Sequence, residues 1–259
     1  MDTATGPALA AAAATRQAAR MDTPLQLLHL DETLVAVNKP AGLPVHRSVY
    51  VGRADDFLID RLRAQVPGPL HPAHRLDRPT SGVLLVGRSA GIAAALGAQF
   101  TDGAIAKTYL AVARGWPEPA AGSIDYPVAG AHGAGPRKDA RTRYRTLATV
   151  EVAIALGRYP QQRYALLQVE PETGRFHQIR QRLAHVHHPL IGDGQHGRSD
   201  HNRLYRQHFG VHRLLLHAWK LRLTHPASGA ALTLQAPLDD AWHGLLARFD
   251  WRHRLEAAV

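Results

Sequence analysis

The sequence contains no cysteine. Disulfide bonds, thiolate metal ligands and thiol nucleophiles are therefore excluded, and so is the RNA methylation chemistry in which a cysteine attacks a pyrimidine ring. An apolar run long enough to cross a membrane as a helix is also missing, so we expect no membrane association. The lack of cysteine suits a reducing compartment, and we expect the protein to act in the cytoplasm.

Acidic residues are scarce relative to basic ones. The chain has 21 Asp and Glu against 31 Lys and Arg, which gives a formal net charge of +10 with histidine neutral. Such a charge suits a polyanionic partner, and nucleic acid is the first candidate. With 45% hydrophobic and 20% charged residues, the chain has the composition of a globular protein rather than of a disordered one.

Residues 1–22 are rich in alanine and lack the charged start and dense apolar centre of a secretory signal. We interpret them as a mobile tail or a fraying helix, and a true start at Met21 is equally compatible. Residues 23–255 contain no linker and no internal repeat, which indicates one domain. Short strands outnumber helices there, and this predicts an α+β fold with a mostly antiparallel mixed sheet flanked by helices and loops.

The expected elements follow from apolar periodicity and from turn residues. Residues 192 to about 210 read as a polar loop, and residues 129–142 as an exposed basic loop. Helices are expected over 55–66, 89–100, 176–188 and 237–249. Strands are expected over 34–37, 83–86, 106–114, 143–155, 163–170, 214–216, 221–223 and 232–234.

Asp77 lies on a loop over residues 74–82, between Arg75 and Arg78, and the apolar run 83–86 follows as a buried strand. Two neighbouring guanidinium groups favour the ionised form of a carboxyl. Loops that a rigid strand positions often carry catalytic groups. A lone Asp in a turn, however, more often caps the turn and pairs with an Arg. The loop by itself leaves both interpretations open.

Two further residues are candidates for chemistry, and each has an ordinary structural alternative. Tyr109 lies in an expected strand, where a half-buried aromatic is common, and Arg180 lies on a basic helix, where a solvated side chain is common. His185 and His188 have a spacing that a metal site could use, but no carboxylate or cysteine nearby completes a ligand set. We therefore expect no metal.

Together these stretches resemble a known family. The run His74-Arg75-Leu76-Asp77-Arg78-Pro79-Thr80-Ser81-Gly82 is similar to the signature of the RluA-type pseudouridine synthases. The resemblance covers about residues 25–250, and a subgroup that modifies tRNA is the most similar. The other matching stretches follow in the order of the family: Asn38-Lys39-Pro40-Ala41-Gly42, Lys107-Thr108-Tyr109, Thr173-Gly174-Arg175-Phe176-His177-Gln178-Ile179-Arg180 and Ile191-Gly192-Asp193.

The resemblance implies a central active-site cleft in a single catalytic domain, with a reaction that needs no cofactor. The bond between ribose C1′ and uracil N1 breaks, the ring turns, and C5 joins C1′. Asp77 would act at the sugar as nucleophile or as base, and the sequence leaves these two roles open. Arg180 would pair with Asp77. Tyr109 would stack on the uracil and help to move the C5 proton, while Ile179 would pack on the other side of the ring.

The resemblance also implies substrate-binding residues. The target base must leave its helix, and Arg75 would fill the space that the base vacates. Further candidates for substrate binding are His74, Lys107, Arg175 and His177. Candidates for phosphate contacts are Lys39, Arg137, Lys138, Arg141 and the loop over 196–206.

The expected function is therefore the isomerisation of a uridine in structured RNA, at uridine 65 in the T-stem of tRNA. RNA is the expected partner, with no obligatory protein partner. Three alternatives stay open: a pseudouridine synthase for large-subunit ribosomal RNA, a non-catalytic RNA-binding protein on the same fold, and a hydrolase that uses Asp77. A non-catalytic binder has no need of Asp77, and a hydrolase would want a second positioned acid or base.

Overall fold

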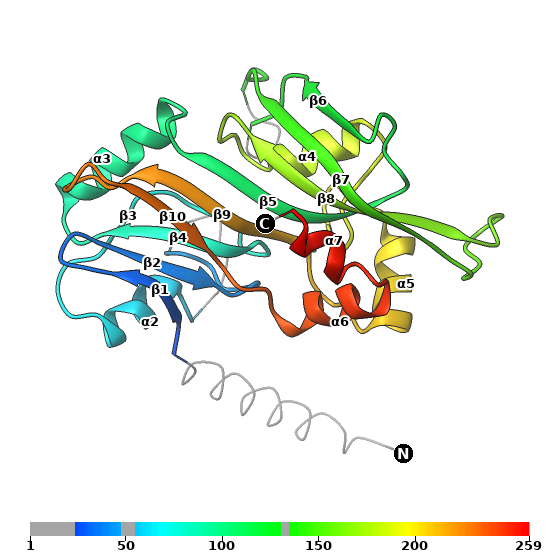
Figure 1. Ribbon diagram of the computed structural model, residues 1–259, viewed down its shortest axis with the longest axis horizontal. Helices are drawn as coiled ribbons and strands as arrows, with labels where there is room; N and C mark the ends of the chain where they lie inside the picture. Colours follow the sequence, from blue (N-terminus) through cyan, green and yellow to red (C-terminus); the bar gives the residue numbers. More distant parts are fainter. Residues whose placement is uncertain (1–23, 48–54, 131–134, 259) are drawn as a thin grey trace, which may run out of the picture.

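The computed structural model describes residues 24–47, 55–130 and 135–258. The alanine-rich stretch over 1–22 and the alternative start at Met21 lie outside this part of the chain. In the described residues, ten strands form one mixed sheet, and six helices flank it (Figure 1). The predicted α+β class, with one sheet and helices on its faces, is confirmed. None of the described helices has the length and apolar character needed to span a membrane.

The sheet runs in the order β1-β2-β4-β9-β5-β8-β7-β6, with β10 beside β9 and β3 beside β4. All pairings are antiparallel except that of β4 with β9. The strands are β1 (Gln26–Leu30), β2 (Leu34–Lys39), β3 (His71–Pro72), β4 (Ser81–Gly87), β5 (Ala106–Arg114), β6 (Ala121–Asp125), β7 (Arg141–Val152), β8 (Gln162–Pro171), β9 (Leu216–Thr224) and β10 (Ala231–Gln235).

The parallel contact between β4 and β9 is a short seam in the middle of the sheet. It consists of two residue pairs, Ser81 with His217 and Gly82 with Ala218. Gly82 has a φ of +113°, and a Cβ on it would lie 2.2 Å from the carbonyl oxygen of Ala218. Only glycine fits this approach, so the seam fixes where the loop over residues 74–82 enters the sheet.

Helices cover both faces of the first half of the sheet. On β2, Val35 and Val37 pack with α2 (Leu58–Gln65), while Leu34 and Ala36 point to the opposite face. That face packs against α3 (Ala90–Thr101), which Ser89 caps by accepting a hydrogen bond from the backbone N–H of Ile92. Because alternate side chains of a strand point to opposite faces, burial on both sides requires continuous apolar runs.

The second half repeats this arrangement around β5 and β8. The helix α4 (Gln178–His185) covers one face, and the other face carries α5 (Ser199–Phe209), α6 (Asp240–Arg248) and α7 (Arg252–Glu256) (Figure 1). Leu110 and Val112 pack toward α5 and α6, while Ala111 and Ala113 pack toward α4. The small alanines let α4 approach the sheet closely, and this helix supplies one wall of the site.

Two expectations about elements were wrong. The stretch 199–209, expected within a polar loop, is the helix α5, because His201, Leu204 and Tyr205 share one buried face of an otherwise polar segment. Gly210 then ends it in the left-handed conformation. The stretches 214–216 and 221–223 were expected as two strands, but a single strand, β9, runs from Leu216 to Thr224. It is continuous because it pairs along its length with β4, β5 and β10.

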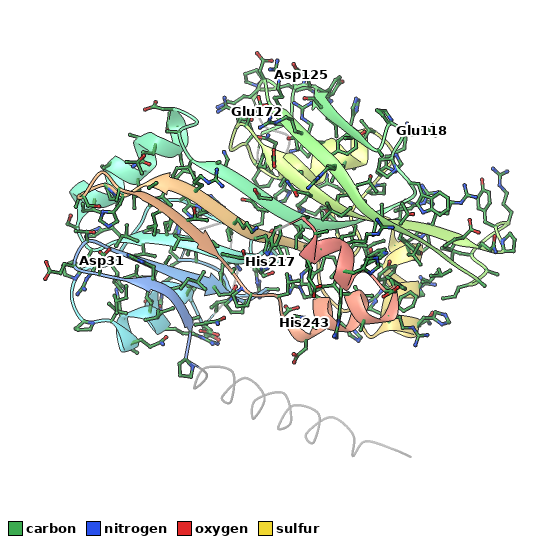
Figure 2. All side chains as sticks on the ribbon, in the orientation of Figure 1. Asp31, Glu118, Asp125, Glu172, His217 and His243 are labelled. Carbon is green, nitrogen blue, oxygen red and sulfur yellow. The ribbon has the colours of Figure 1, made fainter. Side chains whose placement is uncertain are left out.

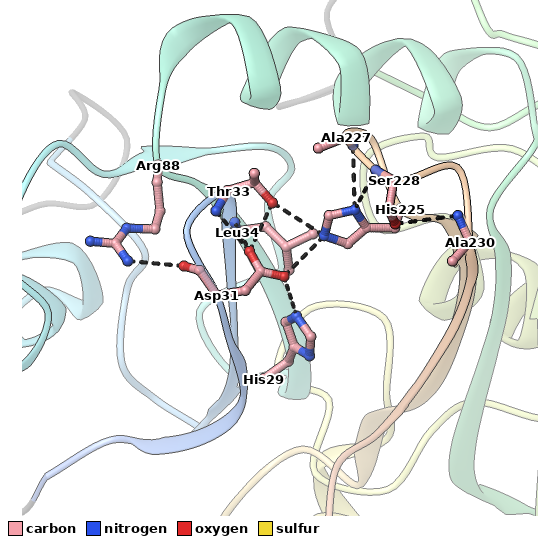
Figure 3. Close-up of polar contacts among 9 residues, drawn as sticks. All are labelled: His29, Asp31, Thr33, Leu34, Arg88, His225, Ala227, Ser228 and Ala230. Atoms are coloured by element: carbon pink, nitrogen blue, oxygen red, sulfur yellow. Dashed lines mark hydrogen bonds and ion pairs between the residues drawn. The ribbon is translucent and has the colours of Figure 1, made fainter.

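A hydrogen-bonded clamp joins the turn after β1 to the turn between β9 and β10 (Figure 3). Asp31 Oδ1 accepts from the backbone N–H groups of Thr33 and Leu34 at 2.7 and 2.9 Å. Asp31 Oδ2 lies 3.0 Å from Nε2 of His225, which is 194 residues away. The clamp therefore connects two turns that are far apart in the chain and fixes the outer end of the first half of the sheet.

Candidate active site

A pocket opens beside the seam, where the loop before β4, strand β5 and the start of α4 come together. It contains eight of the ten predicted site residues, all except Lys39 and His74. The residues that line it are Arg75, Leu76, Asp77, Thr80, Lys107, Tyr109, Pro171, Thr173, Gly174, Arg175, Phe176, His177, Gln178, Ile179, Arg180 and Leu216. Side chains from distant parts of the sequence thus share one concave surface, as expected for a ligand site.

Arg180 connects two carboxylates. Its Nη1 donates to Asp77 Oδ2 at 3.1 Å, while Nε and Nη2 donate to the two carboxylate oxygens of Asp193 at 2.7 Å each. The side chain is only 4% exposed. Burial by itself would lower the pKa of Arg180, but the hydrogen bonds and charges of Asp193 and Asp77 raise it. The guanidinium is therefore a fixed positive charge that faces Asp77.

Asp193 is a residue of the site that was not among the predicted site residues. It is buried, and its Oδ1 also accepts from the backbone N–H groups of Gln195 and His196 at 2.9 and 3.0 Å. Burial would raise the pKa of Asp193, but these bonds and Arg180 lower it. The sequence signal that could have identified Asp193 is the stretch Ile191-Gly192-Asp193, which is one of the matching stretches described above. Gly192 has a φ of +79°, and a Cβ on it would lie 1.9 Å from the Arg213 carbonyl oxygen.

Tyr109 and Ile179 form apolar walls of the pocket. Tyr109 projects from β5, next to a register shift against β9 between Thr108 and Tyr109. Ile179 is buried in the first turn of α4 and belongs to the same apolar cluster as Tyr109. Burial and then the charge of Asp77 raise the pKa of Tyr109, so the phenol keeps its proton near neutral pH.

His177 lies between Asp77 and a second histidine. Its Nδ1 is 3.0 Å from Nε2 of His196, and its Nε2 is 3.6 Å from Oδ2 of Asp77. The ring stacks on Phe176 with 3.7 Å between the centroids. Burial lowers the pKa of His177 to about 4, with further lowering by Arg180 and His196, although the charge of Asp77 acts in the opposite direction. The imidazole is therefore neutral near pH 7.

Three basic residues, Arg75, Lys107 and Arg175, also line the pocket. The side chains of Arg75 and Arg175 are exposed, and that of Lys107 is buried with its Nζ 3.3 Å from the carbonyl oxygen of Thr173. Gln178 Oε1 accepts from the backbone N–H of Arg175 at 3.0 Å and from the hydroxyl of Thr173 at 2.7 Å. Gln178, which was not among the predicted site residues, therefore organises the turn that carries Arg175.

Lys39 lies elsewhere, contrary to the expectation of a phosphate contact. Its side chain is fully buried, and Nζ donates to the carbonyl oxygens of Pro40, Leu43 and Arg78 at 2.9, 2.8 and 3.0 Å. An ammonium group with three carbonyl partners is not available to a phosphate. Lys39 instead ties the loop after β2 to the Asp77 loop.

His74 is also a structural residue here and does not line the pocket. Its Nε2 accepts from the backbone N–H of Leu85 at 3.0 Å, and its ring packs against Phe100 at 4.3 Å between centroids. Burial, followed by the charge of Lys107, lowers the pKa of His74 to about 3. The neutral ring braces the Asp77 loop against β4.

A second support lies under the seam. His217 Nε2 lies 3.2 Å from the carbonyl oxygen of Ala236, so Nε2 carries the proton and Nδ1 accepts from the Ser81 hydroxyl at 2.8 Å. Arg213 Nη2 donates to the same hydroxyl oxygen at 2.6 Å. Figure 2 shows His217 in the centre of the molecule. Burial lowers the pKa of His217 to about 4, so its imidazole is neutral near pH 7.

The described residues contain one group of side chains with metal-like spacing, and it lies outside the pocket: His29, Asp31 and His225 (Figure 3). Nδ1 of His225 accepts from the backbone N–H groups of Ala227 and Ser228 at 3.3 and 3.1 Å. The ring proton must therefore sit on Nε2, the atom that faces Asp31. A metal-bound histidine has the opposite pattern, with its free nitrogen donating, so the chemistry of this group favours a hydrogen-bonded clamp.

The histidines that were considered for a metal in the sequence have other contacts. His185 stacks on Tyr126 with 3.9 Å between the centroids, and His188 Nδ1 lies 2.9 Å from the carbonyl oxygen of Arg114. The two side chains therefore have separate surroundings in the described structure.

Comparison with known proteins identifies relatives over most of the chain. Residues 33–185 match the family model described as RNA pseudouridylate synthase. The chain is 44% identical over 240 residues to tRNA pseudouridine synthase C of Vibrio cholerae, covering 89% of this chain and 98% of that protein. It is 46% identical over 238 residues to tRNA pseudouridine synthase C of Salmonella typhi, covering 88% and 91%. The solved structure of human RNA Pseudouridylate Synthase Domain Containing 4 is similar with a TM-score of 0.68 and 26% identity, covering 93% and 96%.

Proposed function

The chain belongs to the RNA pseudouridylate synthase family, whose enzymes isomerise uridine to pseudouridine, and from that premise we propose that its substrate is tRNA and that its catalytic residues are Asp77, Tyr109 and Arg180. One observation carries this assignment. Asp77 is the single carboxylate among the described residues that line the pocket, and the fixed guanidinium of Arg180 faces it.

Asp77 acts at the ribose. Breaking the bond between C1′ and N1 requires an ionised carboxylate beside the sugar, and the Nη1 of Arg180 both favours the ionised form and restricts the rotation of the side chain. The partial exposure of Asp77, at 22% of its side chain, leaves an oxygen accessible to a ligand. Nucleophilic attack at C1′ and removal of the C2′ proton are both compatible with this geometry.

Tyr109 and Ile179 hold the uracil during its turn. Two apolar surfaces allow a ring to rotate in its plane, because neither makes directional bonds with it. The protonated phenol of Tyr109 keeps that wall uncharged next to Asp77. The base stays bound between cleavage and the new bond.

Basic residues outside the pocket position the RNA. Arg75 is exposed at the pocket, where a planar guanidinium can stack in the space left by the flipped base. Arg175, Arg137, Lys138 and Arg141 are also exposed, which suits contacts with the phosphate backbone. Such contacts set the position of a helical RNA, whose shape then decides which uridine reaches Asp77.

The relatives named tRNA pseudouridine synthase C support tRNA as the substrate, and we assign the target as uridine 65 in the T-stem. To test this substrate, the purified protein is incubated with tRNA transcripts and with large-subunit ribosomal RNA fragments. Pseudouridine is then mapped by carbodiimide modification and primer extension. We expect one T-stem site in tRNA and none with Asp77→Asn. Modification confined to ribosomal RNA would replace tRNA as the substrate, and the absence of any product would overturn the function. We expect this reaction to take place in the cytoplasm.

A further inference from the structure

We propose that His177 accepts the proton that leaves C5 of the turned uracil, and that His196 carries a proton onward from His177. This inference deepens the proposed function of the Asp77 pocket and rests on it. It gives a role to two histidines that form a pair across 19 residues of sequence.

The reaction itself requires such a group. After C5 has bonded to C1′, the C5–H bond must break so that the ring becomes aromatic again, and its electron pair stays in the ring. N1, which lost its bond to C1′, must receive a proton. The isomerisation is therefore neutral in protons and electrons overall, but one group has to take a proton near C5, and solvent can supply the proton at N1.

The position of His177 matches the place where the C5–H bond breaks. C5 must reach C1′, and under the proposed function C1′ lies against the carboxylate of Asp77. Nε2 of His177 is 3.6 Å from Oδ2 of that carboxylate. The imidazole nitrogen therefore lies on the side of the pocket where the new C1′–C5 bond forms.

The other titratable groups of the pocket are poor acceptors. Among the described lining residues, a guanidinium group has no lone pair that could take a proton. Burial lowers the pKa of Lys107, but its Nζ is directed at the carbonyl oxygen of Thr173 and away from the role of an acceptor. The resemblance implies that Tyr109 helps to move the C5 proton, but burial and then the charge of Asp77 raise the pKa of its phenol, so Tyr109 keeps its own proton and we assign this step to His177 instead. Asp77 is placed at the sugar by the proposed function, and His177 is then the lining side chain among the described residues that offers a ring lone pair near pH 7.

His196 completes a path for the proton. In the productive tautomer, Nδ1 of His177 donates to Nε2 of His196 over 3.0 Å, and Nε2 of His177 is free to accept. When Nε2 takes the proton from C5, the Nδ1 proton moves to His196 Nε2, and His196 releases its own Nδ1 proton to solvent. His196 is half-buried, so its outer nitrogen can reach water.

Asp77 assists this step because its charge has returned before the C5–H bond breaks. Whether Asp77 forms a bond to C1′ or removes the C2′ proton, completion of the new sugar–base bond regenerates the carboxylate. A carboxylate 3.6 Å from His177 stabilises the imidazolium that forms there. Its charge already opposes the lowering of the pKa of His177.

The backbone holds His177 in an unusual conformation. Its φ is 48°, in the left-handed region that residues other than glycine rarely adopt, and the ring stacks on Phe176. Backbone strain of this kind persists at sites where a side chain must keep one direction. The ring is thus held toward Asp77 and His196.

The experiment measures single-turnover rates on a tRNA transcript that carries 5-deuterouridine or ordinary uridine. We expect little isotope effect in the wild type, where C5 deprotonation follows slower steps. His177→Gln should slow product formation about 100-fold and reveal a primary isotope effect, because deprotonation becomes rate-limiting. Added imidazole should partly restore His177→Ala. His196→Asn should show a smaller loss and a changed pH profile.

The control is His243→Gln, which alters an exposed histidine on α6 (Figure 2) that is not among the residues lining the pocket. It should leave the rate unchanged. A slow His177→Gln without an isotope effect and without rescue by imidazole would mean that His177 only packs against its neighbours, and a normal rate would also overturn the proposal. If the wild type forms no pseudouridine in any RNA, the proposed function fails instead, and the two failures are distinguishable.

Discussion

Arg180 reaches Asp77 with a single nitrogen, because Asp193 holds the other two. Nη1 lies 3.1 Å from Asp77 Oδ2, while both bonds to Asp193 measure 2.7 Å. The two shorter bonds are to Asp193, which is buried and does not line the pocket. Asp193 therefore sets the position of the guanidinium, and Asp77 is left with a fixed counter-charge and some freedom to move.

The first prediction concerns Asp193→Ala. Removing this carboxylate leaves the buried charge of Arg180 with one partner, and breaking a buried ion pair typically costs about 3–5 kcal/mol of stability. We expect a loss of that order in urea unfolding and a drop in activity of about 100-fold, because the guanidinium no longer has a fixed position. Asp200→Ala, which removes an exposed carboxylate paired with Arg198, is the control and should change both values little. A stable and fully active Asp193→Ala would contradict the assignment.

The second prediction separates chemistry from binding. Asp77→Asn keeps the size of the side chain but removes its charge, so we expect no detectable pseudouridine while RNA affinity stays within a few fold. A filter-binding titration beside the product assay measures both quantities. Near-normal turnover in Asp77→Asn would exclude Asp77 as the catalytic carboxylate.

The third prediction contrasts two lysines. Lys39→Ala removes three buried hydrogen bonds and should destabilise the protein by about 2–3 kcal/mol, without changing the salt dependence of RNA binding. Lys138→Ala removes an exposed charge and should leave stability unchanged. If Lys138 contacts a phosphate, the slope of log affinity against log salt falls by about one. A reduced slope for Lys39→Ala alone would reverse the two roles.

The fourth prediction is a pH dependence of stability. Burial raises the pKa of Asp31, but the stronger combined effect of His29, Leu34 and Thr33 lowers it below the ordinary value of 3.8. A carboxyl with a lowered pKa in the folded state contributes stability above its unfolded pKa and loses it as the pH falls further. The difference in unfolding free energy between the wild type and Asp31→Asn should be present at pH 5 and shrink below about pH 4. A difference that grows below pH 4 would contradict the clamp.

The sequence was sufficient to identify the residues that share a motif with known enzymes. Asp77, Tyr109 and Arg180 meet in one pocket, although Asp77 and Arg180 are 103 residues apart. The continuous apolar runs of the central strands also indicated burial on both faces. These features depend on local pattern or on a shared motif, and both can be read along the chain.

Other features depend on contacts that no local pattern reveals. Lys39 is a charged residue at the end of β2, directly before a Pro/Gly-rich loop, a setting typical of an exposed side chain, and only the folded chain supplies its three carbonyl partners. The role of Asp193 depends on the side chain of Arg180 turning away from its own helix. The helix α5 was missed because its few apolar positions lie among His, Arg and Asn, so that burial against the sheet decides its conformation.

The seam between β4 and β9 has a practical consequence. Asp77 lies on one side of it and Tyr109 and Arg180 on the other, so any rotation of the two halves about these two residue pairs changes the distances among the three proposed catalytic residues. The chain has no cysteine of its own. Cysteines introduced at exposed positions on either side, such as Glu32 and Ser123, would carry a pair of fluorescent or spin labels without background. The distance between those labels, measured with and without RNA, would report whether the two halves of the enzyme rotate about the seam when RNA binds.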